Sequence, residues 1–226
     1  HTVIGTGRRQ EKLDELQTQL GDNFIPLNFD VSDLPATKTA LQTLPTDLRN
    51  HIDVLVNNAG LALGLESADK TDFADWQQMV NTNILGLIHL THEILPFMVA
   101  NNDGYIINLS STAGNYPYFG GNVYGATKAF VTQFSLNLRA DLVGKNIRVS
   151  NIEPGLCGGT EFSNIRFHGD DAKAAQVYNS VQYVTPQDIA NMVAWLIEQP
   201  KHVNINRIEV MPTAQTFAGL KVVKDL

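Results

Sequence analysis

The chain has 226 residues, of which 43% are hydrophobic and 17% are charged, and its formal net charge at pH 7 is −7. This is the composition of one soluble globular domain with a full core, and the negative charge disfavours nucleic acid and anionic membranes as partners. The chain also lacks an uninterrupted run of 18 apolar residues and a signal-peptide pattern. We therefore expect a cytoplasmic protein whose partners are small molecules and copies of itself.

The single cysteine, Cys157, excludes an internal disulfide. His89 and His92 lie three residues apart, but no third histidine or cysteine lies near them in the sequence. We interpret the two histidines as helix-surface or interface residues and predict no metal site.

Strands and helices are predicted to alternate, which is the pattern of a parallel sheet covered on both faces. Strands are expected at residues 1–5, 24–29, 52–58, 104–110, 147–152 and 205–210. Helices are expected at 9–20, 34–44, 72–100, 122–143 and 186–199. Thr185-Pro186 opens the last helix as a cap followed by proline in the first turn. The predicted fold class is α/β, a doubly wound parallel sheet in three αβα layers within a single domain, 1–226.

Residues 155–183 interrupt this alternation. The segment is polar, carries Gly158, Gly159 and Gly169, and has no sustained periodicity. We predict a mobile flap over a substrate, and a long surface loop is the alternative.

Ser111, Tyr124 and Lys128 form the most informative pattern. Residues four apart lie on one helix face, so the Lys128 ammonium is expected beside the Tyr124 phenol, where it would lower the pKa of the phenol. Ser111 follows the expected strand 104–110, at the edge where open α/β sheets bind ligands. A tyrosine so tuned can exchange a proton with a substrate oxygen while Ser111 hydrogen-bonds that oxygen.

The three-residue pattern has a chance expectation of about one in a hundred, whereas Tyr-x-x-x-Lys alone is a weak signal. The alternative interpretation makes Ser111 a turn residue, Tyr124 a half-buried aromatic and Lys128 a solvated charge.

Further motifs accompany these residues: Asn57-Asn-Ala-Gly60 after the apolar run 54–56, Asn83-Ile-Leu-Gly86, Tyr124-Gly-Ala-Thr-Lys128 and Pro154-Gly155. In order and spacing they resemble the short-chain dehydrogenase/reductase family over essentially the whole chain. The resemblance implies a Rossmann-like sheet and hydride transfer. Within the family, the stretches 111–128 and 153–163 resemble bacterial NADP-dependent 3-hydroxy acid dehydrogenases. Members of that group oxidise serine, allo-threonine and related acids such as 3-hydroxypropionate, or reduce malonic semialdehyde.

The family begins with a strand and a glycine-rich turn that holds the cofactor pyrophosphate, whereas this sequence opens at what resembles the second strand, His1-Thr-Val-Ile-Gly5. We expect the chain to be an amino-terminally incomplete part of a longer protein, and we expect activity of these residues alone to be impaired.

Arg8 and Arg9 stand at the end of the first expected strand, where a carboxylate would select NAD. Guanidinium groups pair bidentately with phosphate, so the two arginines favour the 2′-phosphate of NADP. A basic helix start is the alternative, although cations are disfavoured at a helix N-terminus.

The resemblance supplies the other cofactor contacts. Asp30 and Val31 correspond to the adenine contact. Asn58, Ala59 and Gly60 would border the adenosine ribose. Pro154, Gly155, Thr160 and Phe162 would run beside the nicotinamide, although Gly158-Gly159 places one residue more than usual before Thr160.

In the predicted mechanism, Tyr124 exchanges the hydroxyl proton, Ser111 steadies the reacting oxygen and Lys128 also holds the nicotinamide ribose. Asn83 would support a proton-carrying water chain, or its amide would bond to backbone at a helix kink. Arg166 is the candidate for the carboxylate of a 3-hydroxy acid.

The surroundings of this site add further expectations. Glu153 and Glu161 argue mildly against a very acidic substrate. Tyr116, Tyr118 and Phe119 would wall a small pocket or pack beneath the loop.

Two other functions remain open: an NADPH-dependent reductase of a ketone without a carboxylate, and a non-catalytic scaffold subunit. The long helices have more apolar positions than one sheet face can cover, and the resemblance implies a homotetramer. The apolar segment 211–220 is a candidate for docking across an interface.

Overall fold

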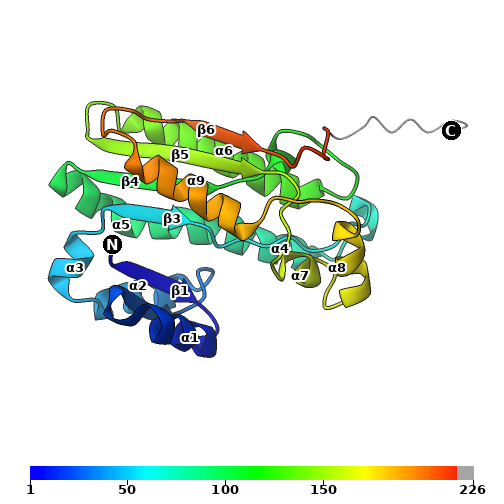
Figure 1. Cartoon of the computed structure of the whole chain (residues 1–226), viewed down its shortest axis with the longest axis horizontal. Helices are drawn as coiled ribbons and strands as arrows, with labels where there is room; N and C mark the ends of the chain where they lie inside the picture. Colours follow the sequence, from blue (N-terminus) through cyan, green and yellow to red (C-terminus); the bar gives the residue numbers. More distant parts are fainter. Residues whose placement is uncertain (218–226) are drawn as a thin grey trace, which may run out of the picture.

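Six parallel strands and the helices between them make up the described part of the protein, residues 1–217, in a computed structural model. The strands are β1 (Val3–Gly7), β2 (Phe24–Asn28), β3 (Val54–Asn57), β4 (Gly104–Leu109), β5 (Ile147–Pro154) and β6 (Arg207–Val210). The α-helices are α1 (Gln10–Leu20), α2 (Leu34–Thr43), α3 (Thr46–Asn50), α4 (Phe73–Val80), α5 (Leu87–Asn101), α6 (Asn122–Asp141), α7 (Phe162–Arg166), α8 (Asp171–Tyr178) and α9 (Pro186–Glu198). The predicted α/β fold in three layers is confirmed (Figure 1).

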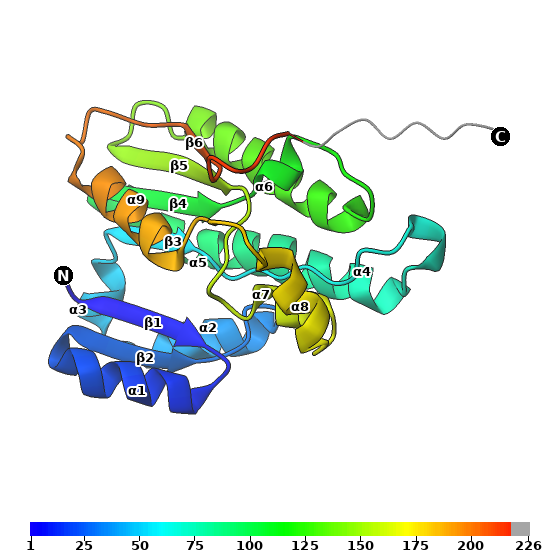
Figure 2. The same cartoon turned by 45° about the vertical axis from the view of Figure 1, so that its right-hand side comes forward.

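Side-chain alternation along the strands divides the core between the two faces of the sheet. Leu55, Ile106 and Val149 point to one face, where they pack with residues of α2, α5 and α6. Tyr105 and Ile107 point to the other face, toward α9. Figures 1 and 2 show α1 and α9 on the side of the strands opposite α5 and α6. The buried strand β4 is thus covered by helices on both faces.

The sheet is interrupted between β1 and β3. Among the described strands, β1 pairs with β2, and β3 begins a separate sheet in the order β3-β4-β5-β6. Val3 and Val56 are 48% and 38% exposed, although residues of a central parallel strand are normally buried. A cavity of about 1660 Å³ starts at this interruption and continues to the carboxyl ends of β4 and β5.

The predicted helix 72–100 consists of α4, a π-helical stretch at Asn81–Gly86 and α5. By length and composition alone, residues 73–101 are long and apolar enough to cross a membrane, and 33% of the most apolar window is buried. A helix that covers the core of a soluble protein passes the same test. Here Leu87, Ile94 and Met98 of α5 are buried, and Ile94 and Met98 pack against the sheet.

The segment 155–183 is more regular than expected. It carries α7 and α8, and Cys157 forms a parallel bridge with Val184. The sequence hid these helices because they are short, five and eight residues, so neither completes enough turns for a periodic apolar pattern. Figure 2 shows both helices beyond the carboxyl ends of the strands.

Candidate active site

The structure brings together Ser111, Tyr124 and Lys128. Ser111 follows β4 and caps a short 3₁₀ turn at Thr112–Gly114, while the other two residues lie in the first turns of α6. A Cβ atom on Gly114 would lie 2.7 Å from the Ala129 nitrogen and 2.8 Å from the Lys128 carbonyl carbon. Only glycine permits this approach, and it holds the Ser111 turn against α6.

Tyr124 is 8% exposed and lines the cavity. Burial is the main reason that its pKa is raised to about 12, against which a hydrogen bond with Ser111 and the charge of Arg166 act to lower it. The phenol therefore carries its proton at neutral pH, which is the state that a proton donor requires. The lowered pKa predicted from the sequence is wrong for this structure.

Lys128 does not act on Tyr124 as predicted. Its ammonium donates a hydrogen bond of 2.9 Å to the Leu109 carbonyl and lies 5.9 Å from the centre of the Tyr124 ring. Burial lowers the pKa of Lys128 to about 8. A buried ammonium that already donates to a carbonyl lowers the pKa of the phenol less than its closeness in sequence suggests.

Arg166, from α7, lies beside Tyr124. Its Nη2 donates to the Tyr118 hydroxyl at 2.5 Å, and its Nε donates to the Gly64 carbonyl at 3.3 Å. The guanidinium carbon lies 5.4 Å from the centre of the Tyr124 ring and 6.0 Å from that of Phe162. Helix α7 thereby places a permanent cation in the cavity beside Tyr124.

Asn83 lies in the π-helical stretch and is 1% exposed. Its side chain accepts from the Leu61 nitrogen at 2.9 Å and donates to the Leu61 carbonyl at 2.8 Å and the Thr127 hydroxyl at 3.0 Å. The kink with an amide bonded to backbone, which the sequence left as an alternative, is present. The water-chain role stays a prediction.

The cavity gathers many of the predicted residues. Those lining it are Asn58, Gly60, Ser111, Tyr124, Lys128, Pro154, Gly155, Thr160, Phe162 and Arg166. A Cβ atom on Gly60 would lie 3.3 Å from Lys128 Nζ and 3.4 Å from Asn83 Oδ1. Glycine at this position therefore leaves room for the side chains of Lys128 and Asn83, which come from two other sequence motifs.

Six predicted site residues lie outside this lining: Arg8, Arg9, Asp30, Val31, Ala59 and Asn83. Arg8 Nη1 lies 3.5 Å from Asp30 Oδ2. Burial acts to raise the pKa of Asp30, but hydrogen bonds from Ser32 and the Arg8 charge outweigh it, and the pKa is lowered. Arg9 binds both carboxylate oxygens of Glu161, at 2.9 Å and 2.8 Å.

The chain is also similar to known proteins in sequence and overall structure. The family model of the short chain dehydrogenases matches residues 1–170. The chain belongs to this family.

Individual relatives are also similar. A probable NADP-dependent dehydrogenase of Haemophilus influenzae is 67% identical over 225 residues, which are 100% of this chain and 89% of the relative. The NADP-dependent 3-hydroxy acid dehydrogenase YdfG of Escherichia coli (strain K12) is 56% identical over 222 residues, 98% of this chain and 89% of the relative. A solved structure of the closed form of serine dehydrogenase complexed with NADP⁺ matches with a TM-score of 0.97 at 55% identity, and covers 100% of this chain and 90% of that chain.

Two acidic residues of this short-chain dehydrogenase differ from their sequence-based interpretation. Glu153 is fully buried and forms a double hydrogen bond with Arg207, and Glu161 is paired with Arg9. Their charges are neutralised, so neither argues against an acidic substrate. The sequence concealed both pairs because their partners lie 54 and 152 positions away.

The three aromatic residues predicted to wall a pocket do not all lie at the cavity. Tyr116 and Tyr118 line the cavity, whereas Phe119 is 61% exposed and outside the lining. The ring of Phe217 lies 4.6 Å from that of Tyr116. Residues 218–220 of the predicted docking segment lie outside the described residues.

The buried ammonium predicts a pH-dependent stability difference. Replacing Lys128 with methionine should raise the free energy of unfolding at pH 7 by roughly 1 to 3 kcal/mol, because the folded state then no longer buries a charge. The pKa of Lys128 falls from 10.5 to about 8 on folding, so the wild type regains stability between these pH values. The advantage of the variant should therefore shrink as pH rises from about 8 to 10.5, which urea denaturation at several pH values measures. An equal difference at all pH values would contradict the buried charge.

Proposed function

We propose that this protein is an NADP-dependent oxidoreductase that acts on the hydroxyl-bearing carbon of a small 3-hydroxy acid. Serine, allo-threonine and the 3-hydroxypropionate/malonic semialdehyde pair are the candidate substrates. The observation that carries the proposal is the grouping of Ser111, Tyr124 and Arg166 in one cavity. Relatives named NADP-dependent 3-hydroxy acid dehydrogenase and serine 3-dehydrogenase support it.

The residues at the end of β1 fit NADP. Arg9 and Arg8 are exposed, and Arg9 holds an anionic carboxylate through two nitrogen atoms. Such a fork matches phosphate oxygens equally well. Arg8 and Arg9 would hold the 2′-phosphate, Asp30 and Val31 the adenine, and Asn58, Ala59 and Gly60 the adenosine ribose. Pro154, Gly155, Thr160 and Phe162 would border the nicotinamide, and Lys128 its ribose.

When bound, NADP supplies or accepts the hydride at the substrate carbon. Tyr124 gives its proton to the carbonyl oxygen in reduction, and in oxidation its phenolate form takes the hydroxyl proton. Ser111 hydrogen-bonds the reacting oxygen and steadies its developing charge. Asn83 would support the proton path to solvent, through Thr127 and the backbone of Leu61 that it already contacts.

Arg166 is proposed to bind the substrate carboxylate. Its cation lies near the Tyr124 ring, so a carboxylate held there would leave the hydroxyl-bearing carbon within reach of the phenol. A reductase of ketones without a carboxylate is the second candidate. Its support is that two guanidinium nitrogens of Arg166 are already bonded to Tyr118 and Gly64.

Association of copies is a further part of the proposal. Leu85, Val99 and Phe130, on the long helices, are 37% to 40% exposed, and covering them would stabilise an assembly. We propose a cytoplasmic homotetramer, and light scattering of the purified protein measures its mass.

Cofactor choice is tested by titrating the protein with NADPH and NADH while following nicotinamide fluorescence. The Arg9→Gln variant should bind NADPH about 10- to 100-fold more weakly, because a charge-assisted pair with phosphate is lost, and should bind NADH as the wild type does. Equal losses for both cofactors would mean that Arg9 acts on folding or on the flap and not on the 2′-phosphate.

Proton transfer is tested with Tyr124→Phe. The variant should bind NADPH normally but lose turnover by about 10²- to 10⁴-fold, since only the exchangeable proton is removed. Single-turnover measurements separate the chemical step from binding. Unchanged turnover would overturn this mechanism, whereas absence of turnover in the wild type itself would favour the scaffold alternative.

Carboxylate recognition is tested with two Arg166 variants and two substrates, serine and serine methyl ester. Arg166→Met should lower kcat/KM for serine by about 10- to 100-fold and leave the ester nearly unaffected, because the ester offers no charge to pair. Arg166→Lys is the matched control, which keeps the cation and should retain more activity toward serine. Unchanged activity toward both substrates would favour the ketone reductase, and equal losses would mean that Arg166 does not act through the substrate carboxylate.

A further inference from the structure

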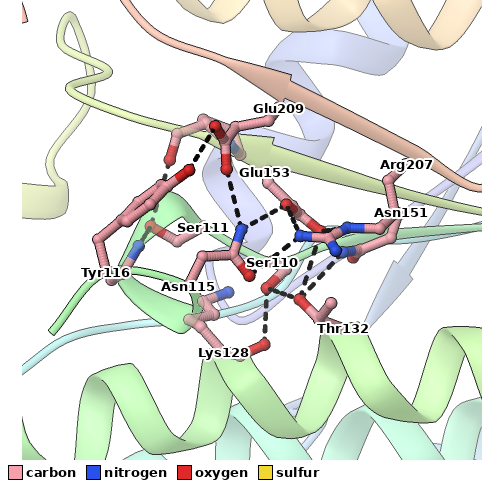
Figure 3. Close-up of polar contacts among 12 residues, drawn as sticks. Ser110, Ser111, Asn115, Tyr116, Lys128, Thr132, Asn151, Glu153, Arg207 and Glu209 are labelled. Atoms are coloured by element: carbon pink, nitrogen blue, oxygen red, sulfur yellow. Dashed lines mark hydrogen bonds and ion pairs between the residues drawn. The ribbon is translucent and has the colours of Figure 1, made fainter. Parts of the chain in front are cut away.

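Glu153 is a fully buried carboxylate at the carboxyl end of β5, directly before Pro154. Arg207 of β6 binds it as a fork, with Nε 2.7 Å from Oε1 and Nη2 2.7 Å from Oε2. Figure 3 shows this pair at the centre of a polar cluster. Asn151 donates to Oε1 at 2.6 Å and Asn115 donates to Oε2 at 2.7 Å. Each carboxylate oxygen thus accepts at least two hydrogen bonds, and the buried charge is fully satisfied.

From this pair, one connection reaches the segment that follows Ser111. The side chain of Asn115 donates through Nδ2 to Glu153, and its Oδ1 accepts from Arg207 Nη2 at 3.0 Å. Asn115 closes the 3₁₀ turn that Ser111 begins. The Ser111 hydroxyl in turn donates to the carbonyl of Pro154, the residue after Glu153, at 3.2 Å.

A second connection reaches Lys128. Asn151, bonded to Glu153, also donates to the Thr132 hydroxyl at 3.1 Å. The hydroxyl groups of Thr132 and Ser110 are 2.9 Å apart, and Ser110 donates to the Lys128 carbonyl at 2.7 Å. Figure 3 shows these contacts as one chain from β5 to α6.

Apolar residues of similar volume often replace a buried ion pair without loss of stability, so stability alone does not account for a charge in this place. A bidentate pair does fix direction, because both partners are planar and both oxygens are engaged. We propose that Glu153 and Arg207 are positioning residues. They hold the Ser111 hydroxyl, and the turn of α6 that carries Lys128, in the orientation that the reaction needs. This inference rests on the proposed function of Ser111 and Tyr124.

Other charged and titratable groups surround the two ends of the network. At the β6 end, Glu209 accepts from Asn115 at 3.0 Å and from the Tyr116 hydroxyl at 3.1 Å. At the reacting end, Tyr118, Arg166 and Lys128 surround Tyr124. The Ser111 hydrogen bond lowers the pKa of Tyr124, so a displaced Ser111 should let that pKa rise.

Glu153→Gln keeps the volume of the side chain but removes its charge. We expect kcat for oxidation to fall about 10- to 100-fold, with a smaller change in KM, because a small displacement of reacting groups costs this much. The rise of the oxidation rate with pH should shift to higher pH. Arg207→Lys keeps a cation and should recover part of the loss.

Asn115→Ala cuts one connection and leaves the ion pair in place, so it carries the test if Glu153→Gln does not fold. It should lower kcat about 3- to 10-fold and shift the pH profile in the same direction. Arg148→Met is the matched control, since Arg148 lies at the other end of β5 and holds the carbonyls of Leu196, Ile197 and Gln199 at the end of α9. That variant should have a lower melting temperature but the same kcat and the same dependence of the oxidation rate on pH as the wild type.

If Glu153→Gln and Asn115→Ala show the kcat and pH profile of Arg148→Met, the pair is only structural and the inference fails. The proposed function would still stand if Tyr124→Phe abolishes turnover in the same assays. If Tyr124→Phe retains full turnover, the proposed function fails, and the inference that rests on it fails as well.

Discussion

The contact between the Ser111 turn and helix α6 is the constraint on which the candidate site depends. Gly114 lets the turn lie against the backbone at Lys128 and Ala129, closer than any side chain would allow. Gly125 is similar on the helix side, because a Cβ atom there would lie 2.9 Å from the Ala113 carbonyl oxygen. Two glycines therefore bring a strand end and a helix start into contact, and the Ser111 and Tyr124 side chains meet as a result.

This contact is made inside the protein, and burial then determines the electrostatics. The pKa of Tyr124 rises to about 12 and that of Lys128 falls to about 8 for the same reason, since both groups leave water. Each shift favours the neutral form. A polar layer also crosses the sheet, with Asn57, Asn108 and Asn151 in register across β3, β4 and β5. Among the bonds of this layer, Asn57 donates to Asn108 at 2.8 Å and Asn108 donates to the Ser135 hydroxyl at 2.8 Å.

Local sequence patterns predicted the positions of individual strands and helices. The strand 104–110 and the helix 122–143 were placed within two residues of β4 and α6, because an apolar run and a 3.6-residue period are local signals. The meeting of Ser111, Tyr124 and Lys128 followed from parallel topology, which sends strand ends to one edge. Contacts between distant segments could not be predicted. Tertiary packing decides these contacts. They are the pairing of Arg9 with Glu161, the position of Arg166 over the Tyr124 ring, the pairing of Glu153 with Arg207, and the hydrogen bond from the Lys128 ammonium to the Leu109 carbonyl.

Most of these contacts between distant segments join residues 153–166 to the remainder of the site. Glu161 reaches Arg9 at the end of β1, Arg166 reaches Gly64 and Tyr118, and Glu153 reaches β6. The segment after β5 therefore contacts the proposed phosphate corner, the proposed carboxylate position and the Ser111 turn. An exposed pair such as Arg9 with Glu161 contributes little to stability, whereas breaking the pair of the buried Glu153 is costly, so the segment is held more firmly at Glu153 than at Glu161.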